Sequence, residues 1–383
     1  MKRIIIVGSG GIGRACGLIL LRHYKEENIR LALADIDQDQ CLDSISWIER
    51  GLGKSISSIE VMPINDKSLK NWNPSGDILL DCTPGACCLA VAEVAVRNQM
   101  HYANLSEHIF ETKKIIKLVN GNSKGFILQT GLAPGFINIF TIKLILSFEE
   151  SHPDIPIENV KMRVGALSSC VSSPSYYAFT WSPAGVSTEY LNDAEVLKDG
   201  KVQFVKPLSE REELFIEGEF FEADFTSGGS SDLPNYYQNK IKNLEYKSLR
   251  YPGHYSWINQ LKKKLGNKLD AESLKWEMLN QTSFQENDRV LIYASVIGRN
   301  KLGYWIEKNK YLEVRPAQFN GVMMSAIQRT TASALAQSAE LLLQDKIRGS
   351  VLQSKMPIDE FLTGTFVEEH YGTCFNDFKW QYD

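Results

Sequence analysis

The chain has 383 residues, of which 43% are hydrophobic and 23% charged, an ordinary globular composition with enough length for two or three domains. This mix excludes a disordered tail protein, a collagen-like fibre and a coiled coil. With 42 Lys and Arg against 46 Asp and Glu, the formal net charge is −4, so the chain lacks the basic character typical of proteins that bind nucleic acid or an anionic membrane.

Cysteine usage and the apolar runs indicate the compartment. The seven cysteines are sparse and form no CxxC pair, which argues against a disulfide scaffold or a structural zinc site. No apolar run approaches the roughly 18 residues that cross a bilayer. The run at residues 4–7 ends in glycines without a cleavage motif, so we interpret it as a strand rather than a signal peptide. We therefore expect a cytoplasmic protein.

Residues 1–130 alternate short apolar runs with helical patterns. Ile12, Ala15, Cys16, Ile19 and Leu20 have the spacing of an amphipathic helix directly after the first run. Further helices are predicted over residues 39–49, 86–96 and 111–119, and strands over residues 4–7, 30–34, 59–62, 78–80, 102–103 and 126–128. This alternation predicts an α/β fold with a doubly wound parallel sheet of the Rossmann type, covered on both faces.

The pattern changes after the segment GLAPG at residues 131–135. Short apolar runs at 160–164, 202–205, 213–217 and 290–296 no longer alternate with helices, and residues 304–306 and 311–314 are expected to form a hairpin across 307–310. A long helix returns over residues 322–343. We therefore predict a dinucleotide-binding domain over residues 1–133, rejoined by about 322–383. Residues 134–321 would form an inserted α+β domain with a mostly antiparallel sheet.

A glycine loop follows the first strand and opens the first helix. The segment Gly8-Ser9-Gly10-Gly11-Ile12-Gly13 has the G-x-G-x-x-G pattern in the strand–turn–helix context that dinucleotide binding requires. Gly8 permits the tight turn, Gly10 lets the backbone approach the pyrophosphate, and Gly13 lets the helix pack closely on the strand. The free N–H groups at the helix start favour the phosphates. The alternative is a glycine-rich turn without a ligand.

An acidic residue ends the second strand. Asp35 follows Gly13 by 22 residues, where a carboxylate accepts hydrogen bonds from the adenosine ribose and repels a 2′-phosphate. The sequence therefore predicts NAD as the cofactor. NADP is the alternative, because neighbouring basic residues such as Arg14 and Arg30 can override a single acid.

The loop after the fourth strand is expected to reach the same ligand. In a doubly wound sheet the ligand lies where the strand order reverses, beside the first and fourth strands. Thr83 and the backbone of Pro84 and Gly85 are therefore expected near the nicotinamide ribose. Alternatively, Pro84 and Gly85 only shape the turn into the next helix.

Seven segments in order carry a family resemblance. They are GSGGIG (8–13), DCTPG (81–85), HYANLSE (101–107), GLAPG (131–135), WSPAG (181–185), LRYPGH (249–254) and RTT (329–331). This set resembles the saccharopine dehydrogenase-like family, in particular the branch with saccharopine reductase and L-lysine dehydrogenase. The resemblance implies a Rossmann domain with an inserted substrate domain whose sheet often serves dimerisation, so a homodimer is expected.

The resemblance also implies hydride transfer between a carbon that bears an amine and the nicotinamide. An amino-acid substrate needs a fixed cation for its carboxylate, which a bidentate Arg supplies better than a Lys. Arg250 matches the family's carboxylate-binding Arg, and Trp181 and Ser182 match a pair that lines the substrate pocket. Gly135 is expected to let the backbone turn under the nicotinamide. Without the resemblance, Arg250 would be a structural ion pair and Trp181 a core residue.

Two residues are candidates for orienting the amine or a water molecule. Asn104 stands where many relatives carry an Asp, and it can hydrogen-bond but not take a proton, so Glu107 is an alternative acid. His254 follows a Pro-Gly turn at an expected helix start, where it either polarises the pocket or only caps the helix. The six histidines show no paired spacing for a metal, and the chemistry needs none.

The sequence thus predicts an NAD-dependent amino-acid dehydrogenase that acts on lysine, saccharopine or a related diamine adduct. One alternative is a polyamine enzyme similar to carboxynorspermidine dehydrogenase. A second is a non-catalytic NAD-binding sensor or scaffold, a role that Asn104 in place of an acid would suit.

Overall fold

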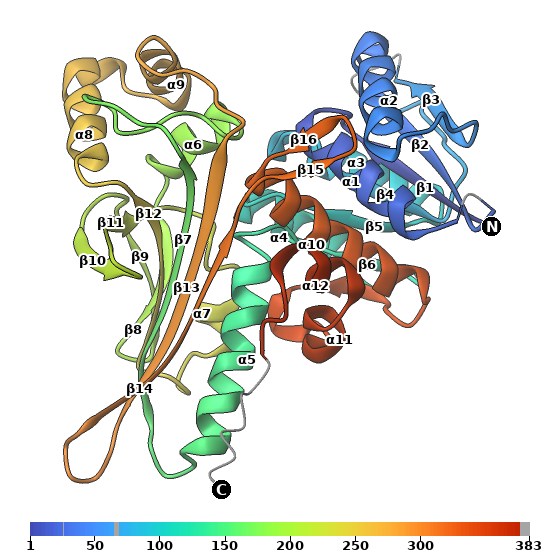
Figure 1. Cartoon of the computed structure of the whole chain (residues 1–383). Coiled ribbons are helices and arrows are strands. Elements are labelled where there is room, and N and C mark those ends of the chain that lie inside the picture. The colour runs from blue at the N-terminus through green and yellow to red at the C-terminus, as the bar shows by residue number, and fades with distance from the viewer. Residues whose placement is uncertain (26, 65–68, 376–383) are drawn as a thin grey trace, which may run out of the picture.

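The computed structural model describes residues 1–25, 27–64 and 69–375. Two sheets dominate the fold, a parallel sheet near the N-terminus and a long twisted mixed sheet (Figure 1). Helices α5 (Phe136–Ser151) and α10 (Ala326–Leu343) lie between them. Within the described part of the chain, no helix is long and apolar enough to cross a membrane.

The parallel sheet has the strand order β17-β6-β5-β4-β1-β2-β3 among the described residues. Its strands are β1 (Lys2–Val7), β2 (Ile29–Asp35), β3 (Ile59–Pro63), β4 (Ile78–Asp81), β5 (His101–Asn104), β6 (Gly125–Ile127) and β17 (Gly349–Val351). The order reverses between β1 and β4, so the predicted doubly wound α/β fold is confirmed. Val7 at the end of β1 pairs with Ala34 on one side and Asp81 on the other, which brings three loops together.

Helices cover both faces of this sheet. Side chains of β1 alternate between two cores: Ile4 and Ile6 pack in the core that contains α1, whereas Ile5 and Val7 pack in the core that contains α3. Each large apolar side chain buried in this way contributes about 1.5–3 kcal/mol. The helices of this half are α1 (Gly11–His23), α2 (Gln38–Leu52), α3 (Cys88–Arg97) and α4 (Ile109–Leu118), with a 3-10 turn at Gly85–Cys87.

The C-terminal segment returns to the parallel sheet. α10 packs on α1, and β17 adds a parallel strand beside β6. The helix predicted from residue 322 begins instead at Ala326, because the Ser325 hydroxyl caps it by accepting the Gln328 N–H at 3.3 Å. The apolar residues before the cap form a short strand, β16 (Val322–Met324), which pairs with β15 (Ala317–Phe319). A 3-10 turn (Gln353–Lys355), α11 (Ile358–Leu362) and α12 (Thr365–Tyr371) follow.

The second sheet is mixed, with the order β10-β11-β12-β7-β13-β14; in addition, β8 pairs with β12, and β9 pairs with β8. Its strands are β7 (Ile157–Ser168), β8 (Ala194–Lys198), β9 (Lys201–Val205), β10 (Glu212–Ile216), β11 (Glu219–Phe225), β12 (Asn243–Arg250), β13 (Asp288–Arg299) and β14 (Trp305–Val314). Only β12 and β7 pair in parallel among the described strands of this sheet. Its helices are α6 (Pro183–Glu189), α7 (Leu233–Tyr236), α8 (His254–Leu265) and α9 (Ala271–Leu279), with a 3-10 turn at Gly266–Lys268.

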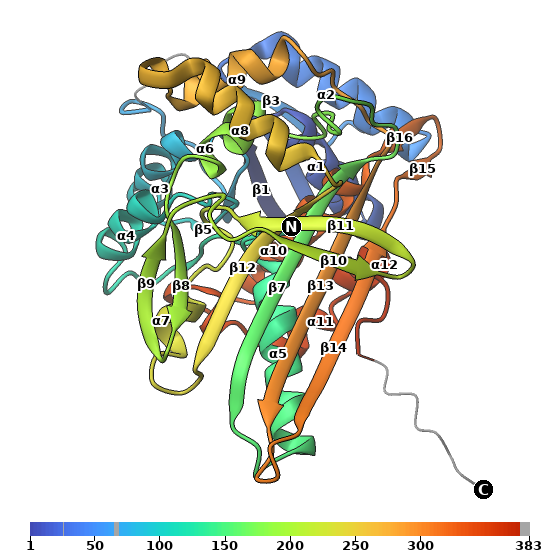
Figure 2. The same ribbon diagram turned by 90° about the vertical axis from the view of Figure 1, so that its left-hand side faces the viewer.

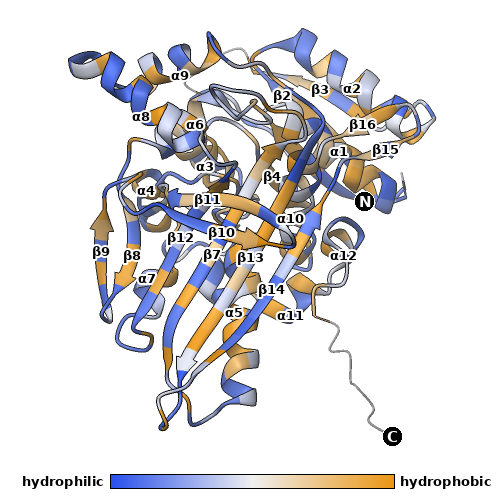
Figure 3. Ribbon diagram, turned by 60° about the vertical axis from the view of Figure 1, so that its left-hand side comes forward, coloured by the Kyte–Doolittle hydropathy of each residue, from blue (hydrophilic) through white to orange (hydrophobic). Residues whose placement is uncertain are grey.

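The two faces of the mixed sheet differ in polarity. Apolar and polar residues alternate along its strands (Figure 3), and alternate positions of β7 such as Val160 and Met162 pack in one core with α5. On the outer face, β10 and β11 cross the central strands (Figure 2). There the buried Arg163 of β7 pairs with Glu212 of β10 and Glu245 of β12.

The hairpin predicted across residues 307–310 is wrong. β14 runs without interruption from Trp305 to Val314, antiparallel to β13. The turn lies one segment earlier, where the Asn300 side-chain oxygen accepts the N–H groups of Leu302 and Tyr304 at 3.0 and 2.9 Å. The charged run that suggested a turn lies on an edge strand, where charged side chains are common.

Candidate functional site

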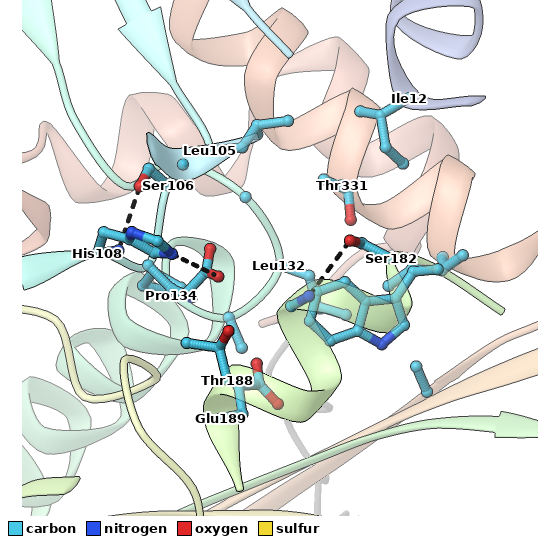
Figure 4. A pocket seen from close by; sticks show the side chains of 18 of the residues that line it. Ile12, Leu105, Ser106, His108, Leu132, Pro134, Ser182, Thr188, Glu189 and Thr331 are labelled. Carbon is cyan, nitrogen blue, oxygen red and sulfur yellow. Dashed lines mark hydrogen bonds and ion pairs between the residues drawn. The ribbon is translucent and has the colours of Figure 1, made fainter. Parts of the chain in front are cut away.

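A cleft of about 420 Å³ lies where the two sheets meet, at the carboxyl ends of the parallel strands. This volume is in the range of small-molecule sites. One wall comes from loops after β1, β4, β5 and β6, and the other from β7, α6 and β12 (Figure 4). Residues of both walls and of α10 line it: Ile12, Cys82–Ala86, Leu105–His108, Gly131–Pro134, Val164, Ala166, Trp181, Ser182, Ala184, Gly185, Thr188, Glu189, Tyr246, Ser248, Arg250, Ile327 and Thr331.

The glycine loop at the end of β1 has the shape that a dinucleotide requires. A Cβ on Gly13 would lie 2.0 Å from the Gly8 carbonyl oxygen, so only glycine allows this packing of helix on loop. A Cβ added to Gly10 would have no atom of the described residues within 4 Å, apart from the adjoining residues of the chain, so the backbone there is open to a ligand. α1 begins at Gly11, and no described side chain caps it, which leaves its N–H groups free for a phosphate. The loop therefore fits the predicted cofactor.

Asp35 lies beside this loop. Its Oδ2 accepts the backbone N–H of Ser9 at 2.7 Å and the Ser9 hydroxyl at 3.0 Å, and its Oδ1 accepts the Asp37 N–H at 3.2 Å. These bonds hold the carboxylate at the edge of the loop. Arg30 is exposed near the opposite end of β2, about 16 Å along the strand, and the Arg14 guanidinium stacks 4.8 Å from the Trp47 ring.

The buried carboxylate of Asp81 holds the loop after β4 in place. The hydroxyl and the N–H of Thr83 donate to Asp81 Oδ1 at 2.6 and 2.9 Å, and the Tyr102 hydroxyl donates to Asp81 Oδ2 at 2.7 Å. Burial raises the pKa of Asp81. Thr83 and Pro84 line the cleft beside the carboxyl end of β1.

The segment 131–135 forms a closed loop at the base of the cleft. The Gly131 N–H donates to the Pro134 carbonyl at 2.9 Å, and the Phe136 N–H donates to the Gly131 carbonyl at 2.8 Å. Gly131 and Pro134 line the cleft, whereas Gly135 lies outside its lining and precedes α5.

Arg250 lies in the opposite wall, at the end of β12. Its side chain is 3% exposed, and its Nε donates to the Tyr190 hydroxyl at 2.8 Å while its Nη1 donates to the Leu249 carbonyl at 2.8 Å. Tyr177 and Tyr190 also pack their rings 5.4 and 5.7 Å from the guanidinium. These contacts hold a buried cation in place beside the cleft.

His254 begins α8 as expected, but it lies outside the cleft lining, behind Tyr190. Its Nδ1 donates to the Ser175 carbonyl at 3.0 Å, which makes Nε2 the acceptor for the Tyr190 hydroxyl at 2.9 Å. Burial and then the Arg250 charge hold the pKa of His254 well below its usual range. His254 is therefore neutral, and it supports Arg250 through Tyr190.

Trp181 and Ser182 both line the cleft. The Ser182 hydroxyl caps α6 by accepting the Gly185 N–H at 3.3 Å (Figure 4). Asn104 ends β5 but is 1% exposed and lies outside the lining, where its side-chain oxygen accepts the Gln129 N–H at 2.8 Å. Asn104 thus braces β5 against the segment after β6.

Two titratable groups in the cleft were missed by sequence reasoning. His108 lies with its Nε2 3.6 Å from Glu107 Oε1 and its Nδ1 3.6 Å from Glu111 Oε2. Glu189 ends α6 and is 7% exposed. Neither residue belongs to a recognisable sequence motif. Their place in the cleft becomes visible only in the folded structure, where the two walls come together.

Two family models together match nearly the whole chain. Residues 4–125 match the saccharopine dehydrogenase NADP binding domain, and residues 131–368 match the saccharopine dehydrogenase C-terminal domain. Curated relatives are the mitochondrial alpha-aminoadipic semialdehyde synthases of Bos taurus, 23% identical over 209 residues, and Mus musculus, 24% identical over 208 residues. Each alignment covers 52% of this chain but 21% of the relative, so the chain matches about a fifth of their length.

Solved structures share the fold over most of the chain. The saccharopine dehydrogenase (L-Glu forming) of Saccharomyces cerevisiae aligns with a TM-score of 0.71 and 16% identity, covering 94% of this chain and 96% of the other. The homospermidine synthase of Legionella pneumophila, solved in complex with NAD, aligns with a TM-score of 0.68 and 13% identity, covering 97% and 90%.

Proposed function

The chain belongs to the saccharopine dehydrogenase family, and on this premise we propose that it is a nicotinamide-dependent oxidoreductase that transfers hydride at a C–N bond of an amino acid. The observation that carries the proposal is the position of Arg250, a buried guanidinium in one wall of the cleft. The opposite wall contains Ile12 of the glycine loop and the loops after β4, β5 and β6. A buried guanidinium is suited to bind a substrate carboxylate through paired hydrogen bonds. Trp181 and Ser182 would then shape the pocket around the bound substrate.

The charges of the cleft favour a substrate rich in amines. Its described lining contains one guanidinium, Arg250, against the carboxylates of Glu107 and Glu189. Saccharopine has three carboxylates and would need further cations, whereas lysine has one carboxylate and two amines. We therefore favour lysine or a carboxylated polyamine over saccharopine, which makes a polyamine enzyme the second candidate.

The cofactor is proposed to bind along the carboxyl end of β1. Gly8, Ser9, Gly10, Gly11, Ile12 and Gly13 would hold the pyrophosphate, with Thr83 and Pro84 beside the nicotinamide ribose. Asp35 favours NAD over NADP, and the position of Arg30 near the opposite end of β2 adds support. When bound, the nicotinamide supplies a two-electron acceptor for hydride. Gly135 remains a proposed backbone support under that ring.

The assembly and compartment are also proposals. We propose a homodimer, with the dinucleotide-binding domain over residues 1–133 and 322–383 and the substrate and dimerisation domain over 134–321; sedimentation velocity would test the assembly. All seven cysteines are free thiols, which supports a reducing compartment such as the cytoplasm.

The direct test is a cofactor-reduction screen. Purified protein is incubated with NAD or NADP and with L-lysine, saccharopine, carboxynorspermidine and other amines at alkaline pH. We expect NAD reduction with an amine that carries one carboxylate. Cofactor binding by calorimetry without turnover of any amine would contradict the proposal and favour a non-catalytic NAD sensor.

A further inference from the structure

Glu189 is a buried acidic residue in the wall of the cleft. It lies at the end of α6, opposite the loops of the parallel sheet, and lines the cleft together with Thr188 and Arg250. Figure 4 shows its carboxylate on the α6 side of the cleft, next to Thr188. The side chain is therefore placed to meet a bound ligand.

The Glu189 carboxylate has no internal partner. Its backbone carbonyl accepts the Ser227 N–H at 3.2 Å, but within residues 1–25, 27–64 and 69–375 no group donates a hydrogen bond to its carboxylate oxygens. No cation of the same residues lies within the 4.0 Å of an ion pair, Arg250 included. Neither carboxylate oxygen is fully buried, because both are open to the cleft, so burial weakens the hydration of the charge without removing it. A proton or a positively charged ligand would stabilise the group further.

Charged groups from several elements act on Glu189. Burial has the largest effect and raises the pKa of Glu189. The charge of Arg250 on β12 lowers this pKa, and the charge of Glu107 after β5 raises it, so that the net result is a pKa of about 8. The other titratable groups that feel its charge are the buried phenols Tyr177, Tyr190 and Tyr246. A carboxyl group with such a pKa exchanges its proton readily at mildly alkaline pH.

We propose that Glu189 is a catalytic residue that accepts a proton from the substrate's ammonium group while Arg250 holds the substrate's carboxylate, an assignment that rests on the proposed function. An α-amino acid carries both charges on one carbon. A guanidinium and a carboxylate that line the same cleft without pairing with each other match such a zwitterion in the signs of their charges.

The reaction breaks one N–H bond and one C–H bond of the substrate. In the oxidation direction an N–H bond of the ammonium breaks, its electron pair stays on nitrogen, and an O–H bond forms on Glu189. That pair then forms the C=N bond as the neighbouring carbon loses hydride to an oxidised nicotinamide dinucleotide. The substrate loses one proton and one hydride, and in the reduction direction Glu189 returns the proton to nitrogen.

The test compares two isosteric variants, E189Q and E195Q. Glu195 on β8 is also a buried carboxylate with a raised pKa, but it accepts a hydrogen bond from Asn235 and lies outside the cleft, so E195Q is the matched control. The wild type is first assayed with NAD and NADP against the amine panel. The best substrate is then used for kinetics between about pH 6 and 10.

We expect E189Q to lower kcat by about 100-fold or more with a smaller change in KM, and to abolish the titration near pH 8. The titration of the amine itself should remain, E189D should restore part of kcat, and E195Q should behave as the wild type. Infrared difference spectra without substrate or cofactor should show a carboxyl that titrates near pH 8 in the wild type and not in E189Q.

Two results would overturn the proposal in distinguishable ways. An E189Q variant that keeps the wild-type kcat and pH profile removes Glu189 from the proton transfer and leaves the proposed function standing. A wild type that oxidises no amine of the panel removes the proposed function and this role with it.

Discussion

Replacing Glu189 with Gln should make the protein more stable at alkaline pH and leave its stability almost unchanged in acid. Gln has the shape of a protonated Glu and cannot ionise, so E189Q removes only the cost of a buried negative charge. The pKa of Glu189 rises from 4.5 in the unfolded chain to about 8 in the folded protein, and burial is the main cause.

The sign and size of the effect follow from proton linkage. Between about pH 4.5 and 8 the folded protein keeps a proton that the unfolded chain releases, so the contribution of Glu189 to stability falls as the pH rises through this window and is constant above it. A pKa difference of about 3.5, at 1.36 kcal/mol for each pKa unit, gives an upper limit of about 5 kcal/mol. Water entry into the cleft will lower this figure.

The assay is denaturant unfolding of wild type, E189Q and E195Q at three pH values that bracket the window, followed by circular dichroism. The stability gain of E189Q over the wild type should grow from acid to alkaline pH. Asp288, whose pKa burial raises to about 6, titrates in all three proteins and cancels in the difference. A gain that is independent of pH, or a loss at every pH, would refute the view that Glu189 is an unpaired buried acid.

The remaining predictions concern the other parts of the site. R250A should raise KM for an amino-acid substrate by about 10- to 100-fold in steady-state kinetics, with R250K recovering only part; an unchanged KM removes Arg250 from the site. Y190F leaves Arg250 and His254 each short of one hydrogen bond, so KM should rise while the pH profile keeps its shape; a lost titration would contradict a purely positioning role. D288A removes the acceptor of two N–H groups at the start of α10 and should cost about 1–3 kcal/mol in denaturant unfolding. D35S should shift preference toward NADP, read as the ratio of the two dissociation constants by calorimetry; an unchanged ratio would show that other residues select the cofactor.

The dinucleotide-binding half could be predicted because its signals are local. An apolar run, a glycine loop and a helical pattern follow one another within about 20 residues, and their order supports a single interpretation as strand, turn and helix. The alternation of Ile4 to Val7 between two cores is the direct result of side chains pointing to opposite faces of β1. Chain order and right-handed crossovers then leave few ways to arrange the strands.

The mixed sheet was harder because its strands come from distant parts of the chain. The charged segment at residues 307–310 of the edge strand β14 has a composition that is also common in turns. Only the pairing of β14 with β13 shows that this segment is a strand. The start of α10 could have been found, since Ser325 and Gln328 form a capping box that the sequence displays. The apolar residues before the cap masked it because they extend the helical pattern backwards.

Glu189 and His254 show why residue type alone misplaces proton chemistry. A His after a Pro-Gly turn invites a catalytic role, yet burial with two hydrogen-bond partners fixes His254 in one neutral form, which neither gains nor loses a proton near neutral pH. A Glu at the end of a short helix looks like a solvated side chain, yet burial without a partner brings its pKa to the range where protons move. The deciding quantity is whether a buried polar group is satisfied, and that depends on which elements meet around it. Satisfied groups such as His254 hold the site in shape, whereas the carboxylate of Glu189 faces the cleft without a protein partner and is where we propose that a substrate binds.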